Sequence, residues 1–165
     1  MNKTVDLKKE SLFKTSFNNS AIGMALVSPD GKWLEVNKSI CDIVGYSKEE
    51  LLTKTFQDIT HKDDLEKDLD YVKKMLDGSI NTYQMEKRYL HKDGHIVWVL
   101  LNVSIIRDES KAPQFFISEV LDINKIKNVN KKLEEKVDEL EKLNKLMVDR
   151  ELKMIDLKKK LNPSP

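Results

Sequence analysis

The sequence predicts an α+β domain, with a five-stranded antiparallel sheet and helices on one face, followed by one long helix. Three observations lead to this fold class. Apolar side chains recur with a period of two in segments bounded by turns, which is typical of strands. Between these segments the apolar spacing is helical. All eleven aromatic residues and all five glycines lie at or before Phe116, and such a compositional step marks a boundary between two architectures.

The first strands are expected to form a hairpin. Residues 5–18 have weak helical spacing and are expected to form an amphipathic flank before it. Residues 22–27 and 33–36 are then predicted strands, and Pro29-Asp30-Gly31 between them is a tight turn.

Helices are expected to follow the hairpin. Asn37 can cap a short helix that ends at Gly45, and Ser47 stands three residues before Glu50, in the spacing of a capping box. Residues 64–76 are predicted to form a longer amphipathic helix.

Three antiparallel strands should complete the sheet. The period falls to two over residues 82–91, with a long apolar strand over 96–106 and a last strand from Phe115. Lys92-Asp93-Gly94 is the turn between the first two, and it should require a positive φ at Gly94. One face of the first of these strands carries Tyr83, Met85, Lys87 and Tyr89.

The bulk composition excludes several classes of protein. The net charge of +1 gives no argument for nucleic-acid binding. Cys41 is the single cysteine, so there is no internal disulfide, and a reducing compartment is expected. No apolar run approaches the roughly 20 residues that span a bilayer. We therefore expect a cytoplasmic protein without membrane insertion.

Four motifs, in order along the chain, resemble those of PAS domains with their PAC extension. They are Ile22 to Val27 with Asp30-Gly31 and Val36-Asn37, then Gly45 to Leu51, then Lys92-Asp93-Gly94 with Trp98-Val99, and finally Asp122-Ile123-Asn124, close to the Asp-Ile-Thr at which PAS domains pass into a following helix. The resemblance covers residues 13–124. It implies a five-stranded sheet with helices on one face, used for sensing, dimerisation or signal relay in regulators such as two-component sensor kinases.

The tail is predicted to be a coiled-coil helix. Ile126 begins a seven-residue apolar repeat that continues to Leu161, and such a repeat specifies a left-handed coiled coil. Asn130 and Asn144 fall on the seam, where they can fix the register of a parallel homodimer. The alternative is a single solvated charged helix. The expected seam comprises Ile126, Leu133, Val137, Leu140, Met147, Met154 and Leu161.

These patterns divide the chain into four parts. Residues 1–18 are the N-terminal flank, 19–124 the PAS domain, 125–161 the coiled-coil helix and 162–165 a disordered tail. The absence of Gly and Pro between the last strand and the helix indicates a stiff joint at Asp122, Ile123 and Asn124. Asp122 or Asn124 can cap the helix.

The sequence offers no catalytic group, and we expect no enzyme activity and no cofactor. His61 is interpreted as a helix-start residue, although haem-binding PAS domains use a helical histidine, which keeps haem at His61 an alternative. Cys41 is interpreted as a structural thiol, because the stretch that corresponds to the flavin motif of photoactive PAS domains reads Thr55 to Ile59. His91 and His95 flank a turn and are expected to be solvated, and no metal-ligand spacing is recognised.

A small-molecule pocket is a minority interpretation beside that of a filled core. Its lining would comprise Met24, Leu26, Phe56, Met85, Tyr89 and Leu100, with Met75 nearby. The leading functional hypothesis is a sensory and signal-relay module. It dimerises through the N-terminal flank and the coiled coil, and it transmits a change to a histidine kinase or nucleotide cyclase domain in a longer parent. The alternative is a non-sensing dimerisation module with a filled core.

Overall fold

The computed structural model describes residues 3–161, with side chains from Glu10 onward. The expected disordered tail at 162–165 lies outside the described residues. The described chain forms two units that meet between Asn124 and Lys125. The elements of the first unit are α1 (Lys3–Asn18), β1 (Gly23–Val27), β2 (Trp33–Val36), α2 (Lys38–Val44), α3 (Lys48–Leu52), α4 (Phe56–Ile59), α5 (Lys62–Leu76), β3 (Thr82–Leu90), β4 (Ile96–Arg107) and β5 (Pro113–Asp122), before α6 (Asn124–Leu161).

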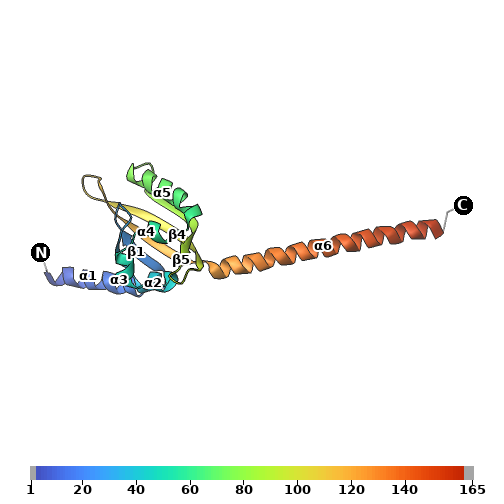
Figure 1. Ribbon diagram of the computed structural model, residues 1–165, viewed down its shortest axis with the longest axis horizontal. Helices are drawn as coiled ribbons and strands as arrows, with labels where there is room; N and C mark the ends of the chain where they lie inside the picture. The colour runs from blue at the N-terminus through green and yellow to red at the C-terminus, as the bar shows by residue number, and fades with distance from the viewer. Residues whose placement is uncertain (1–2, 162–165) are drawn as a thin grey trace. The chain divides into compact units, whose positions relative to one another are not determined.

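The five strands form one antiparallel sheet, as the sequence predicted, and their order in it is β2-β1-β5-β4-β3 (Figure 1). β5, the last strand, lies in the centre of the sheet and pairs with β1 on one side and β4 on the other. Its register places Val120 opposite Gly23 on one side and Leu101 on the other. The strand that leads into α6 is therefore held along both edges.

Helices α2 to α5 follow one another between β2 and β3 and pack on one face of the sheet (Figure 1). Strand residues of one parity face these helices and form the core, as the alternating burial of β3 and β4 shows. Ile40, Leu51 and Ile59 are the corresponding buried residues of the short helices. The opposite sheet face carries half-buried and exposed apolar residues, including Leu34 and Leu121.

The residues predicted to cap the helices form the hydrogen bonds expected of them. The Asn37 side chain accepts a hydrogen bond from the Ile40 N–H, and the same residue ties the hairpin to α2 by accepting from the Met24 N–H at 2.9 Å. Ser47 and Glu50 form the reciprocal capping box. Gly45 ends α2 with a φ of +76°. These local patterns determine the helix boundaries because each satisfies backbone groups that the helix itself cannot pair.

Some elements differ from the sequence-based expectation. α5 begins at Lys62 rather than Asp64, because His61 provides the cap. α4 was not predicted as a separate helix, although Thr55 and Asp58 have capping-box spacing and the Asp58 carboxylate accepts from the Thr55 N–H at 2.7 Å. β5 begins at Pro113, two residues earlier than expected.

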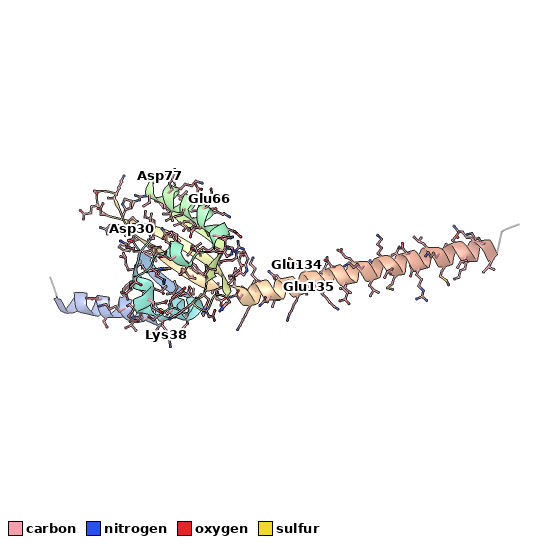
Figure 2. All side chains as sticks on the ribbon, viewed as in Figure 1. Asp30, Lys38, Glu66, Asp77, Glu134 and Glu135 are labelled. Atoms are coloured by element: carbon pink, nitrogen blue, oxygen red, sulfur yellow. The ribbon has the colours of Figure 1, made fainter. Side chains whose placement is uncertain are left out.

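As far as Leu161 the second unit is a continuous helix that carries charged side chains such as Glu134 and Glu135 (Figure 2). None of the described side chains of α6 is buried. No helix in the described range 3–161 combines the length and the apolar character that a membrane span needs.

Candidate functional site

A buried ion pair lies between the sheet and α5. Lys87 belongs to the inward-facing set of β3, and Asp68 faces it from the middle of α5. The Lys87 Nζ is 2.5 Å from an Asp68 carboxylate oxygen, and the two side chains are 1% and 0% exposed. Buried charges are costly unless they are paired and hydrogen-bonded, so the neighbours of this pair decide whether it is tolerated.

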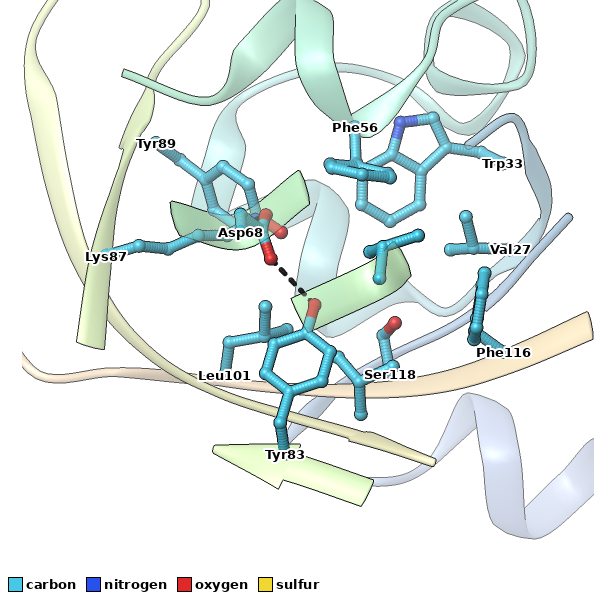
Figure 3. A pocket seen from close by; sticks show the side chains of 12 residues that line it. Val27, Trp33, Phe56, Asp68, Tyr83, Lys87, Tyr89, Leu101, Phe116 and Ser118 are labelled. Atoms are coloured by element: carbon cyan, nitrogen blue, oxygen red, sulfur yellow. Dashed lines mark hydrogen bonds and ion pairs between the residues drawn. The ribbon is translucent and has the colours of Figure 1, made fainter. Parts of the chain in front are cut away.

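Polar and aromatic groups surround both charges. The Tyr83 hydroxyl donates to the second Asp68 oxygen at 2.6 Å, which Figure 3 marks with a dashed line. The Lys87 ammonium also donates to the Thr60 hydroxyl at 3.3 Å, and it lies 4.4 Å from the centroid of the Tyr89 ring. Such cation–π contacts strengthen when water is excluded. Both charges of the pair are therefore hydrogen-bonded within the core.

The protonation states follow from these contacts. Burial lowers the pKa of the Lys87 ammonium, but Tyr89 and Asp68 more than offset that effect and leave its pKa above the ordinary lysine value. Burial and the charge of Asp68 raise the pKa of the Tyr83 hydroxyl. At neutral pH, Lys87 is a cation and Tyr83 is a neutral donor.

A cavity adjoins the network, but it is small. Its volume is about 20 Å³, which is close to the space of one water molecule. Ligand pockets usually enclose roughly 300–1,000 Å³. Twelve residues line it (Figure 3): Val27, Trp33, Phe56, Asp68, Val72, Tyr83, Lys87, Tyr89, Leu101, Val103, Phe116 and Ser118. The interior of this fold is therefore nearly filled.

Only some of the residues expected to line a pocket reach the cavity, and for those on strands the face of the sheet decides. Phe56 and Tyr89 line the cavity. Met85 and Met75 are buried in the core but are not among the lining residues. The other three, Met24, Leu26 and Leu100, alternate to the opposite face of the sheet and do not reach the cavity. The sequence does hold the signal for Lys87, since it shares the parity of Met85 and Tyr89.

A second set of charges fastens the start of α5 to β3. The Arg88 guanidinium donates two hydrogen bonds to Asp64, both at 2.8 Å, and a third to Asp63 at 3.3 Å. The bonds from Arg88 hold the pKa of the Asp64 carboxyl below its usual value. His61 lies at the same junction, where its Nδ1 accepts from the Asp63 N–H. His61 is thus placed as the cap of α5.

Cys41 and the histidines of the β3–β4 turn are placed as follows. Cys41 is half-buried in α2, and burial raises the pKa of its thiol. The expectation that both turn histidines are solvated holds for His95, which is 56% exposed, but not for His91, which is only 20% exposed. His91 is shielded because it lies against Gly45 at the end of α2.

Hydrogen bonds hold the joint between β5 and α6 to the sheet. The Asp122 carboxylate accepts from the Asn124 N–H at 2.8 Å, so it caps the first residue of the helix. The Asn124 side chain does not cap α6; its oxygen accepts from the Trp98 N–H of β4 at 3.1 Å. The buried Ile123 donates its N–H to the Trp98 carbonyl at 2.9 Å. The backbone of β4 thus binds both residues that precede Lys125.

The expected seam residues all lie exposed on α6. Ile126, Leu133, Val137, Leu140, Met147, Met154 and Leu161 are between 45% and 79% exposed in the single chain. Six of them are seven residues apart, and Val137 stands four residues after Leu133, so all seven lie along one side of the helix.

Comparisons with known proteins match this geometry. A profile of the family described as the PAS fold matches residues 34–119. A probable diguanylate cyclase, DgcE of Escherichia coli, is 47% identical over 133 residues, which are 79% of this chain and 12% of that protein. The sensor histidine kinase TmoS of Ectopseudomonas mendocina is 24% identical over 131 residues, 79% of this chain and 14% of that protein.

Among solved structures, a PAS domain from Colwellia psychrerythraea superimposes with a TM-score of 0.64 at 24% identity, over 72% of this chain and 98% of that one. This likeness shows the fold. The chain spans only about an eighth of the length of each of the two signalling proteins, so neither match is evidence of a catalytic domain in this chain. The family profile, the strand order and the shared fold agree, and the relatives are signalling proteins: the chain belongs to the PAS family of sensory domains.

Proposed function

We propose that this chain is a signal-relay module that dimerises through α1 and α6 and biases a catalytic output domain in a longer parent. The observation that carries the proposal is the joint. Asn124 and Ile123 bind the backbone of Trp98 in β4, so the chain leaves the sheet for α6 from two residues that are held to a central strand. A change in the sheet therefore reaches the helix without a slack linker between them.

The α6 helix supplies the second half of the relay. A lone helix in water would leave its apolar seam exposed, and pairing of two chains would bury it. Two copies joined along α6 can convert a small movement at each joint into a change of helix register or pitch. In this proposal the output is a cyclase, because the relative that is 47% identical is a probable diguanylate cyclase; a kinase output is the second candidate.

The small size of the cavity supports a module that relays a signal without a retained ligand. With only about 20 Å³ beside Lys87 and Asp68, the core has no space for a haem, a flavin or a comparable planar molecule in this conformation. The absorption spectrum and native mass spectrum of the purified protein test this point. A chromophore or a mass adduct retained in stoichiometric amount would instead support the ligand-sensing form.

Sedimentation of the chain at micromolar concentration tests the dimer. Wild type should sediment as a dimer, Leu140→Asp on the seam should shift it to monomer, and Lys145→Asp on the outer face of α6 should leave it dimeric. Circular dichroism establishes whether α6 is still helical in each variant. A wild-type monomer with an intact helix overturns the dimer.

An exchange experiment tests the output. This chain replaces the matched 133-residue segment of the Escherichia coli cyclase, and cyclase activity is compared between the chimera and the same chimera with Asn124→Ala. Activity that depends on Asn124 supports relay, because Asn124→Ala removes the bond to Trp98. Equal activity of the two chimeras assigns the chain to the non-sensing dimerisation alternative.

A further inference from the structure

The β3–β4 turn gathers three potential metal ligands that have no part in the relay described above. His91 follows β3, Asp93 lies in the turn and His95 precedes β4. One donor atom from each of the three lies within 4.8 Å of the other two. We propose that His91, Asp93 and His95 form a binding site for a divalent transition-metal ion of the Zn²⁺ class.

The backbone of the turn brings the two histidines together. The His91 N–H donates to the His95 carbonyl at 2.9 Å, and the Gly94 N–H donates to the His91 carbonyl at 2.8 Å. Gly94 has a φ of +95°, which closes the turn tightly enough for the imidazole rings to stack with centroids 4.2 Å apart. The residues i, i+2 and i+4 thus share one side of the turn, although a strand alone would spread them along its length.

His91 is a preorganised ligand. Its ring is largely shielded because it packs against the end of α2, where a side chain at Gly45 would collide with it at 2.3 Å. The neighbouring Lys92 N–H donates to the Val44 carbonyl at 3.0 Å, which fixes the same part of the turn to α2. A ligand held in this way loses little conformational entropy on binding an ion.

The three side chains are already close together, so small side-chain movements would bring them to the spacing of metal ligands. The Asp93 carboxylate oxygen is 2.9 Å from the His91 Nδ1 and 2.5 Å from the His95 Nδ1. Ligands that share a tetrahedral Zn²⁺ at about 2.0–2.2 Å stand roughly 3.4 Å apart. Asp93 and His95 are both exposed, so their side chains are free to rotate by this amount and leave the remaining coordination positions open.

The chemistry of the donors favours a transition ion over Mg²⁺ or Ca²⁺. Two imidazoles with one carboxylate suit Zn²⁺, Ni²⁺ and Cu²⁺, whereas oxygen-only sets suit Mg²⁺ and Ca²⁺. Two further carboxylates, Asp42 and Asp122, line the same surface concavity as the two rings and add negative charge around it. Asp122 is also the cap of α6, so a bound ion would lie in the same concavity as the joint.

Zinc titration by calorimetry on protein without a histidine tag tests the site. Wild type should bind one Zn²⁺ ion per chain, His95→Ala and Asp93→Ala should each weaken binding at least about tenfold, and His61→Asn should leave it unchanged. His61 is the matched control because it is the one histidine of the chain outside this turn. Zn²⁺ should raise the melting temperature of wild type and of His61→Asn, but not that of His95→Ala.

Electron paramagnetic resonance with Cu²⁺ gives an independent readout. Nitrogen hyperfine splitting from two imidazoles is expected in wild type and from one in His95→Ala. The proposal is overturned if Zn²⁺ does not bind to folded wild-type protein, or if His95→Ala and Asp93→Ala bind it as wild type does. In either case the His–Asp contacts only stabilise the turn.

Discussion

Lys87 on β3 and Asp68 on α5 form a 2.5 Å ion pair that is closed to water. The pair joins the sheet to α5, the longest of the helices between β2 and β3, and both residues line a small cavity. Tyr83 and Thr60 complete its hydrogen bonds. The pair therefore links α5 to the sheet through a buried, hydrogen-bonded contact.

Replacing Lys87 with Met should lower the free energy of unfolding by about 3–5 kcal/mol, because it leaves the Asp68 carboxylate buried without its cation. Urea unfolding followed by circular dichroism measures this change. The variant Lys87→Met combined with Asp68→Leu and Tyr83→Phe should recover most of the loss, since it removes both charges and the hydroxyl that depends on Asp68. A Lys87→Met variant as stable as wild type would contradict the buried pair.

Replacing Gly94 with Val should destabilise the sheet by about 1 kcal/mol or more, because a β-branched residue is strained at a φ of +95°. Space does not limit this site, since no atom lies within 4 Å of the added Cβ. Gly45→Ala should cost more, because its new methyl group also meets the His91 ring. Thermal unfolding of the two variants compares strain alone with strain plus collision. An unchanged melting curve for Gly94→Val would be inconsistent with the turn.

The Asp64–Arg88 contact should make stability depend on pH in the acid range. Arg88 lowers the folded-state pKa of Asp64 below its ordinary value of 3.8. The contact therefore stabilises the fold fully above that value, and the contribution is lost as pH falls through the lowered pKa. Asp64→Asn should cost about 1.5–3 kcal/mol at pH 7.

Urea unfolding of wild type and Asp64→Asn at several pH values between 7 and about 2 measures the difference. The gap between the two proteins should close only in the most acidic samples. Asp63→Asn is the matched control, because Asp63 is 55% exposed and its longer contact with Arg88 should contribute little. A gap that is constant across the range would show that Asp64 acts without its charge.

Asp122→Ala should leave the sheet folded while it changes how α6 begins. The substitution removes the acceptor of the Asn124 N–H and should cost about 0.5–2 kcal/mol, which is comparable to the bias of a two-state switch. Spin labels near Leu133, introduced by Lys132→Cys in a Cys41→Ser background, report the distance between the two helices of a dimer.

The distance distribution should shift or broaden in Asp122→Ala. Asp108→Ala is the control, since it loses equivalent turn hydrogen bonds in the β4–β5 connection, remote in sequence from the joint. If Asp122→Ala and Asp108→Ala both reproduce the wild-type distribution, the joint is a tether and transmits no change.

The local chemistry of the chain made much of the fold predictable. Asn37, Ser47 and Gly94 act on backbone groups within a few residues, and such interactions are readable from short sequence patterns. The same logic would have found α4 from Thr55 and Asp58. The sequence predicts the start of α5 two residues late, although it already indicates His61 as a helix-start residue; the hydrogen bond from the Asp63 N–H to His61 confirms that role.

The candidate site was predictable only in part, because it depends on which strand face meets which helix. The sequence determined the α+β class, the PAS resemblance, the alternation along β3 and the repeat of α6. Only the tertiary structure decided that Lys87 meets Asp68, that Leu101 rather than Leu100 faces the core, and that His91 and His95 converge on Asp93. Alternation is a local consequence of backbone geometry, whereas the pairing of residues nineteen positions apart is set by the packing of α5 on the sheet.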